Sequence, residues 1–413
     1  MVHRHRLRFA LDSFCLGMIL LHGVVLWHAY GQIVEALPDL RIFYTAGLML
    51  RRGQGPTLYN DDLQLKTQRE FVALRPTDHS PLPYNHPPFE AILFLPFTYL
   101  PFLRGYALWF LVNGLLLAIS IHVVRPYIPA IVKELPELLF LAPLAFFPVF
   151  YAFLQGQDSV LLLLLYCLAY AAFRRGRDLQ AGIWLGLGLF KFHLVLPFAF
   201  ILLLRRRWRA LGGILLSACG EIAVSCALVG WRELLYYPRY AWHVNQLQAK
   251  AVIVPANMPN LRGLLTGWNH SPALRLPLDL LLLGLSLCLL VWVARRWTPS
   301  DLLHADAWDT GFSLAVIATF LVGYHGYNQD FSIALLPILL TFNRLLHSER
   351  SRVGTALRIL LGLLFLSPLY LVLTLVLRKQ SFFALVILAF LFCLAKFRPT
   401  QDCTPAAQAT ASA

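Results

Sequence analysis

The chain has 413 residues, of which 58% are hydrophobic and 14% are charged, and its mean hydropathy is +0.64. A soluble domain of ordinary composition does not reach these values, so the sequence predicts an integral membrane protein and excludes a disordered, coiled-coil or collagen-like chain. Most arginines behind the formal net charge of +14 lie in short clusters between apolar runs, and no segment is polar enough to form a nucleic-acid-binding domain.

The first apolar run extends from Phe9 to about Tyr30 and follows a basic stretch. Its length approaches the roughly 20 residues of a spanning helix, and no small-residue cleavage site follows it. We therefore expect an uncleaved first span with a cytoplasmic amino terminus.

Further apolar runs predict an all-α, polytopic bundle of roughly 11 to 13 membrane segments, some of them short. We expect one domain over residues 1–398 and a disordered cytoplasmic tail over 399–413. The positive-inside rule assigns the basic clusters to the cytoplasmic face and leaves two outer loops, 31–86 and 230–272. The basic clusters lie at 174–177, 205–209, 295–296, 344–352 and 396–398.

Two stretches do not fit a simple alternation of sides. The clusters at 174–177 and 205–209 both belong inside, yet the apolar chain between them is long enough for only one crossing. Gly186 and Gly188 precede Lys191 there, which predicts two half-helices that meet near Lys191 and line a polar cavity. The prolines between residues 125 and 157 indicate a second broken or re-entrant path.

The first outer loop combines polar residues with short apolar patterns. Asp39 precedes a predicted amphipathic surface helix with Phe43 on its apolar side, and a second surface helix is expected to begin near Asn60. The carboxylate of Asp39 can serve as a general base, but it can equally cap the helix or pair with Arg41.

Several motifs, in this order, resemble glycosyltransferase family 87. They are Asp-Leu-x-x-Phe-Tyr-x-Ala-Gly at 39–47, Leu58-Tyr59, Pro87-Pro88-Phe89, Gln155-Gly156-Gln157, Ala181-Gly182 leading to Lys191, Asn260-Leu261-x-Gly263, and His325-Gly326-Tyr327 with Asp330. Members of this family are polytopic GT-C enzymes that use polyprenyl-phosphate mannose.

The resemblance implies an inverting hexosyl transfer to a lipid-linked or cell-envelope glycan, with Asp39 as the base and an α-mannoside as the product. A leaving phosphate needs fixed positive charge, and Lys191 is the first candidate, followed by Arg262 and His193. Snorkelling to the interface is the alternative for Lys191. The other polar residues expected to line the sugar and acceptor cavity are His86, Gln155, Gln157, Asp158, Asn260, His325, Tyr327 and Asp330, unless they only satisfy one another.

A transporter or flippase for a lipid-linked sugar is the competing function. A transporter concentrates its polar residues at the midplane, whereas the predicted set projects to the outer face of the plasma membrane, which favours the enzyme. The sequence has no suitable nucleotide-binding glycine pattern, in agreement with a lipid donor. No metal-ligand pattern lies on one predicted helix, so we expect neither a metal nor another cofactor. The expected partners are the polyprenyl-phosphate sugar, the glycolipid or glycan acceptor and membrane lipids, but not nucleic acid.

Overall fold

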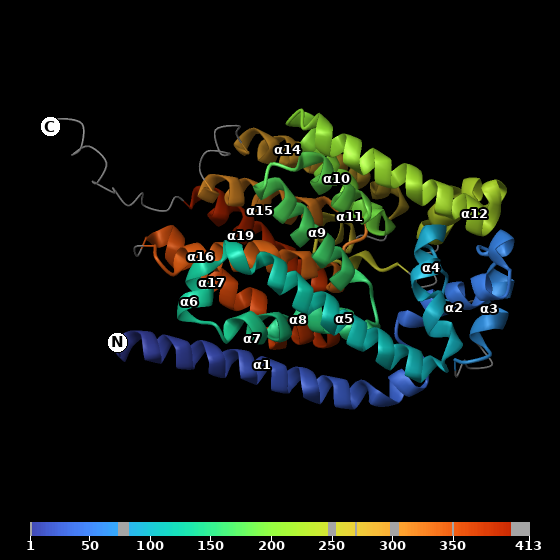
Figure 1. The fold of residues 1–413 in the computed structure, drawn as a ribbon, viewed down its shortest axis with the longest axis horizontal. Coiled ribbons are helices and arrows are strands. Elements are labelled where there is room, and N and C mark those ends of the chain that lie inside the picture. Colours follow the sequence, from blue (N-terminus) through green and yellow to red (C-terminus); the bar gives the residue numbers. More distant parts are fainter. Residues whose placement is uncertain are drawn as a thin grey trace.

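The computed structural model describes residues 2–72, 82–246, 253–268, 271–297, 305–348 and 351–397. These residues form helices α1 to α19, joined by turns and short 3-10 segments, and contain no strand (Figure 1). The predicted all-α fold is confirmed. The tail expected to be disordered, 399–413, lies outside the described residues.

Four helices are long and apolar enough to cross a membrane, and three bent helix pairs raise this number to seven if each pair is one span. The long helices are α1 (Val2–Val34), α5 (Phe102–Val124), α12 (Trp208–Gln246) and α14 (Pro272–Arg296). The bent pairs are α7 (Leu138–Ala145) with α8 (Phe147–Gln155), α10 (Asp178–Gly186) with η5 (Leu189–Lys191) and α11 (Phe192–Leu204), and α17 (Arg352–Phe365) with α18 (Ser367–Leu371) and the turn after it.

The protein is thus a polytopic membrane protein, but it has fewer candidate spans than the roughly 11 to 13 segments predicted. Hydropathy cannot separate a lipid-spanning helix from a short helix that is apolar because protein surrounds it. Helix α9 (Ser159–Arg174) is such a case, with 13 of its 16 residues buried. The remaining described helices are α4 (Ala91–Phe94), α6 (Pro129–Glu134), α13 (Leu261–Thr266), α15 (Ala305–Val322), α16 (Leu335–Leu345) and α19 (Phe383–Lys396).

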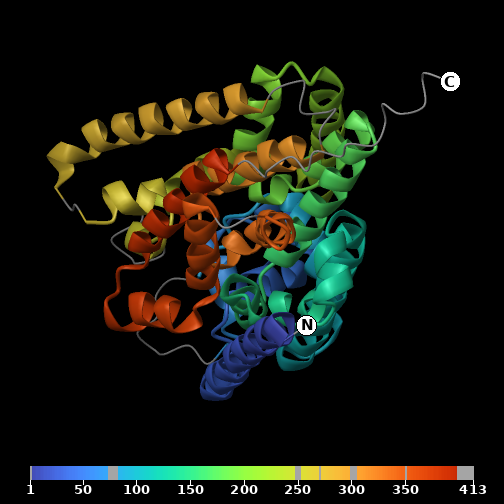
Figure 2. The same cartoon turned by 90° about the vertical axis from the view of Figure 1, so that its left-hand side faces the viewer.

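Helix α1 lies along one side of the bundle (Figures 1 and 2). Only 11% of its most apolar window is buried, and Trp27 is 81% exposed, as expected for a helix that faces lipid. One buried polar residue anchors it: the ring nitrogens of His22 lie 3.0 Å from the Leu144 carbonyl oxygen and 2.8 Å from the Ser367 hydroxyl. Helices in a bilayer gain no hydrophobic free energy from packing on each other, so polar contacts of this kind help to hold them together.

The predicted break between the two arginine clusters is confirmed. Helices α10 and α11 are bent by 61°, and the 3-10 turn η5 (Leu189–Lys191) separates them. Helix α10 packs closely on α12, where a Cβ on Gly182 would lie 1.9 Å from the Ala210 carbonyl oxygen. This close approach fixes one side of the break. The path between residues 125 and 157 is also broken, with a bend of 63° between α7 and α8.

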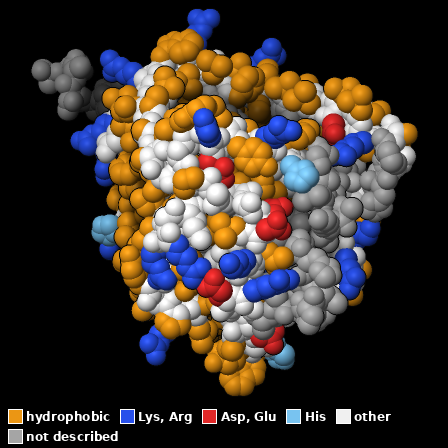
Figure 3. Space-filling view, turned by 90° about the vertical axis from the view of Figure 1, so that its right-hand side faces the viewer, with side chains coloured by type: hydrophobic (Ala, Val, Ile, Leu, Met, Phe, Trp, Pro, Cys, Tyr) orange, Lys and Arg blue, Asp and Glu red, His pale blue; other side chains and the backbone are white. Residues whose placement is uncertain are grey.

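The first predicted outer loop folds over one end of the bundle, where α2 (Leu40–Arg51), α3 (Asp61–Gln68) and α4 lie together (Figure 1). The interpretation of α2 as a surface helix is wrong, because nine of its twelve residues are buried. Residues 88–99 cover it, whereas the sequence showed only one apolar side. Helix α3 begins as predicted, with the Asn60 side chain accepting a hydrogen bond from the Leu63 amide. Figure 3 shows charged side chains of both signs on this end.

Helix α8 ends at a tight turn that places Gln155, Gln157 and Asp158. Gly156 has a φ of +64° there, in the left-handed region, and a Cβ on it would lie only 2.7 Å from the Cβ of Leu40. Only glycine meets both the backbone conformation and the close contact with α2.

We expect Gly156→Ala to lower the free energy of unfolding by about 1 to 3 kcal/mol, through left-handed strain and the clash with Leu40. Gly176→Ala is the matched control, because Gly176 also has a positive φ, +69°, but open space around its Cβ position. Unfolding of the detergent-solubilised variants measures both. Equal losses for the two variants would contradict a role for the contact with Leu40.

Candidate active site

A buried ion cluster lies at the break between α10 and α11. The Lys191 ammonium is 3.0 Å from Oδ1 of Asp158 and 2.9 Å from Oδ1 of Asp330, and all three side chains are at most 4% exposed. Ser159 donates a hydrogen bond to Asp330, and the other Asp330 oxygen accepts one from the Tyr327 amide, 3.0 Å away. The cluster therefore connects the broken helix to the start of α9 and to the turn before η9 (Gln329–Ala334).

Gln157 connects this cluster to Asp39. Its side-chain oxygen lies 3.3 Å from the Lys191 ammonium, and its amide nitrogen donates a 2.8 Å hydrogen bond to Oδ2 of Asp39. Gln155 accepts a bond from the Asp39 amide at 3.2 Å. Asp39 lies at the amino-terminal cap of α2, but its carboxylate makes no cap hydrogen bond. The carboxylate thus points to the polar cluster, and the helix-cap alternative does not hold.

The environment of Asp39 favours the protonated form of its carboxyl group. Burial raises its pKa, and the opposing effects of the Gln157 hydrogen bond, Arg41 and Lys191 do not cancel this shift. The hydrogen bond from Gln157 orients the Asp39 carboxylate through Oδ2. A buried carboxylate that is oriented in this way can act as a general base.

A second acid, Glu90, was not selected from the sequence. Glu90 is fully buried, and its Oε2 lies 3.0 Å from Nδ1 of His86. Burial raises the pKa of Glu90 to about 7 and that of Asp158 to about 8, so near neutral pH these two buried carboxyls retain a proton. Burial lowers the pKa of His86 to about 4, which keeps its ring neutral.

Basic and aromatic residues of two other segments flank the cluster. The Arg262 guanidinium lies 3.8 Å above the Tyr324 ring, and its Nη1 donates to the Tyr324 carbonyl at 2.9 Å. The His325 ring is 5.9 Å from that of His193, whose buried Nε2 has no hydrogen-bond partner among the described residues. Asp330, His193 and Arg262 all influence the pKa of His325, which burial lowers well below its ordinary value.

The predicted site residues therefore converge, although their roles differ. Asn260 is structural: its side chain caps α13 and donates a 2.7 Å hydrogen bond to the Gly323 carbonyl. The hydroxyl oxygen of Tyr327 accepts a hydrogen bond from the Val254 amide and is therefore directed to that segment. Helix α5 also supports the site, because Asn113 donates to the Gln157 carbonyl and Trp109 donates to the Gly156 carbonyl. An asparagine inside an apolar span was the signal that could have revealed this support.

A cleft of about 60 Å³ lies between the end of α1 and the end of α8, and Asp39 is not among its lining residues. Ile33, Pro38 and Gln155 are among its lining residues. No cluster of three or more His, Cys, Asp or Glu in the described ranges is arranged to bind a metal ion. The expectation that no metal takes part stays a prediction.

Residues 84–323, more than half of the chain, match glycosyltransferase family 87. The chain belongs to this family. No curated protein and no solved structure matches it. The match includes the turn at Gln155, Lys191 and Arg262, whereas Asp39 lies before it and Asp330 after it. This protein is thus a membrane glycosyltransferase, and the resemblance seen in its motifs is confirmed at the level of the family.

We expect Lys191→Ala to destabilise this glycosyltransferase by about 3 to 5 kcal/mol, because it leaves Asp158 and Asp330 buried without their cation. Adding Asp330→Asn should recover part of the loss. Lys133→Ala is the control, since Lys133 is exposed. Thermal unfolding in detergent measures the effect. A fully stable Lys191→Ala protein with weakened donor binding would instead support the predicted phosphate contact.

We expect the stability of Glu90→Gln relative to wild type to rise with pH. A carboxyl whose pKa is about 7 in the folded protein and near 4.5 when unfolded favours folding less as pH increases through that window. Glutamine cannot ionise and so escapes this loss. Thermal unfolding between about pH 5 and about pH 8 tests this, with the exposed Glu35→Gln as control. Parallel pH profiles for Glu90→Gln and wild type would refute the assignment.

Proposed function

We propose that this family 87 enzyme is a GT-C mannosyltransferase that transfers mannose from polyprenyl-phosphate mannose to a lipid-linked or cell-envelope glycan. The single observation that carries the proposal is the Asp39 carboxylate: Gln157 orients it, and burial raises its pKa. The neighbouring Pro38 and Gln155 line a cleft. These are the properties of a base that accepts a proton from a bound hydroxyl.

In the proposed reaction, Asp39 takes the proton of an acceptor hydroxyl while the hydroxyl oxygen attacks the anomeric carbon. The bond between that carbon and the phosphate oxygen breaks, and its electron pair leaves with the polyprenyl phosphate. Attack opposite to the leaving group inverts the anomeric centre, so a β-linked donor gives an α-mannoside. No metal or other cofactor takes part in this scheme.

The leaving phosphate needs positive charge, and the geometry supports different contributions from the three candidates. The Lys191 ammonium already contacts Asp158, Asp330 and Gln157, so Lys191 would act through its charge. Arg262 is a direct candidate, because the Tyr324 contacts fix its guanidinium in the site. The unpartnered Nε2 of His193 supports a direct contact as well.

The sugar and acceptor hydroxyls would contact the neutral polar residues around Asp39. His86, Gln155 and Tyr327 line this side of the cluster and can both donate and accept hydrogen bonds. Arg174 and Arg175 lie at the far end of α9 and support a cytoplasmic location for that end. Because the site lies at the opposite end of α9, this supports an extracytoplasmic location for the site in the plasma membrane.

The deciding experiment measures transfer of radiolabelled mannose from polyprenyl-phosphate mannose to membrane lipid extracts. We expect Asp39→Asn to slow transfer at least ~100-fold, because the loss of a general base costs about that much. Asp62→Asn, in the exposed first turn of α3, is the control and should retain activity.

Two outcomes would overturn the proposal. Full activity of folded Asp39→Asn would remove Asp39 as the base. No transfer by the wild-type enzyme from any polyprenyl-phosphate sugar would remove the donor class, and a nucleotide-sugar donor could then be tested in the same assay.

A further inference from the structure

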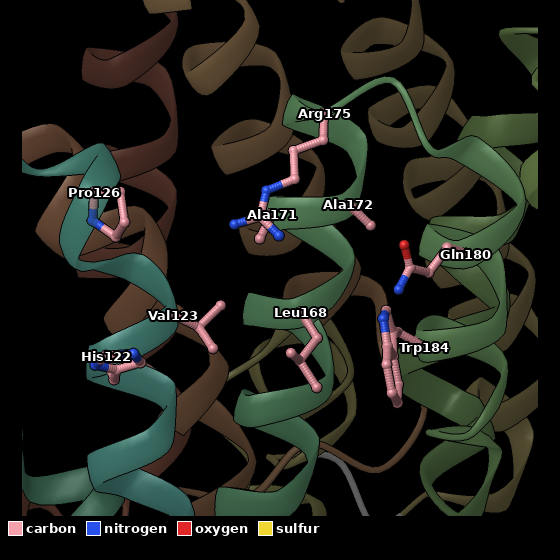
Figure 4. A pocket seen from close by; sticks show the side chains of 9 residues that line it. All are labelled: His122, Val123, Pro126, Leu168, Ala171, Ala172, Arg175, Gln180 and Trp184. Atoms are coloured by element: carbon pink, nitrogen blue, oxygen red, sulfur yellow. The ribbon is translucent and has the colours of Figure 1, made fainter.

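A second cavity lies far from the candidate active site. It has a volume of about 220 Å³ and lies between α5 and α10, with α9 as its floor (Figure 4). The active-site cluster begins at the amino-terminal end of α9, whereas Arg175 follows its carboxy-terminal end. With 16 residues in α9, the two regions are about 24 Å apart.

The cavity is most polar at one end. Arg175 and Gln180 provide polar side chains there, and Figure 4 shows the Arg175 side chain extending toward Ala171. His122 lies at the other end, level with Leu168 and Trp184. Val123, Leu168 and Trp184 line the part nearer the middle of the helices. Small side chains on α9, Ala171 and Ala172, leave the space between the neighbouring helices open.

The charge of Arg175 is not neutralised by its surroundings. No acidic residue lines the cavity, and among the described residues Arg175 makes no ion pair. The nearby basic residues are different: Arg174 pairs with Asp309, and Arg207 pairs with Asp178 at 3.0 Å. Of these three arginines, only Arg175 brings a charge without an ion pair to the cavity.

We propose that this cavity binds one anionic glycerophospholipid. Arg175 would contact the lipid phosphate, Gln180 would donate a hydrogen bond to one of its oxygens, and the first part of an acyl chain would lie against Leu168 and Trp184. The volume is below that of sites for whole drug-sized ligands, which fits a phosphate group with the beginning of one chain. Bundles with basic pockets at one membrane face bind lipid headgroups in this way.

The test is native mass spectrometry of the purified full-length protein in detergent, titrated with phosphatidylglycerol or with zwitterionic phosphatidylcholine. We expect one phosphatidylglycerol to bind with a preference over phosphatidylcholine, and Arg175→Gln to weaken its binding about fivefold to tenfold, as the loss of one basic contact predicts. Leu168→Trp should fill the cavity and abolish the first binding event.

The matched control is Arg177→Gln, because Arg177 is exposed on the same turn but does not line the cavity. Wild-type binding by both Arg175→Gln and Leu168→Trp would overturn the proposal, as would an equal loss in Arg177→Gln, which would indicate non-specific attraction. Thermal unfolding checks that each variant is folded. The proposal does not depend on the sugar donor, so its failure would leave the proposed function untouched.

Discussion

The ion cluster around Lys191 is the constraint on which the site depends. A cation buried inside a membrane bundle must be paired, because desolvation of an isolated charge costs far more than packing can return. Asp158 and Asp330 provide the pairing, and Gln157 uses the same ammonium to orient its amide toward Asp39. Segments from three other parts of the chain, at 157–158, 191 and 330, are thereby fixed relative to the candidate base.

Broken helices are the structural device that makes this cluster possible. A continuous helix satisfies its own backbone and offers lipid or neighbours only side chains, whereas a break exposes polar backbone that must be enclosed by protein. The turn at η5 places Lys191 inside the bundle, and the left-handed turn at Gly156 places Gln157 and Asp158 opposite it. The cost of interrupting two apolar helices is partly offset by the contacts of Lys191 with Asp158, Asp330 and Gln157.

Helix α9 separates two chemically different regions. At its start, carboxyls and a buried lysine form a site in which protons and charges are closely coupled. At its end, Arg175 projects its charge into a cavity with an apolar interior. Because α9 is buried and central, a substitution that shifts it would disturb both regions, although neither contacts the other.

The sequence by itself determined the membrane class, the helical fold, the family and the break before Lys191, because apolar runs, paired glycines and clustered arginines are local signals. It also selected most of the polar residues that meet in the site, since polar groups in apolar segments are rare. Only the tertiary structure decided that Lys191 contacts Asp158 and Asp330, that Glu90 joins them and that α2 is buried. There are two physical reasons. An apolar segment has the same hydropathy whether it is buried in protein or in lipid. No local sequence spacing specifies which distant residue neutralises a buried charge.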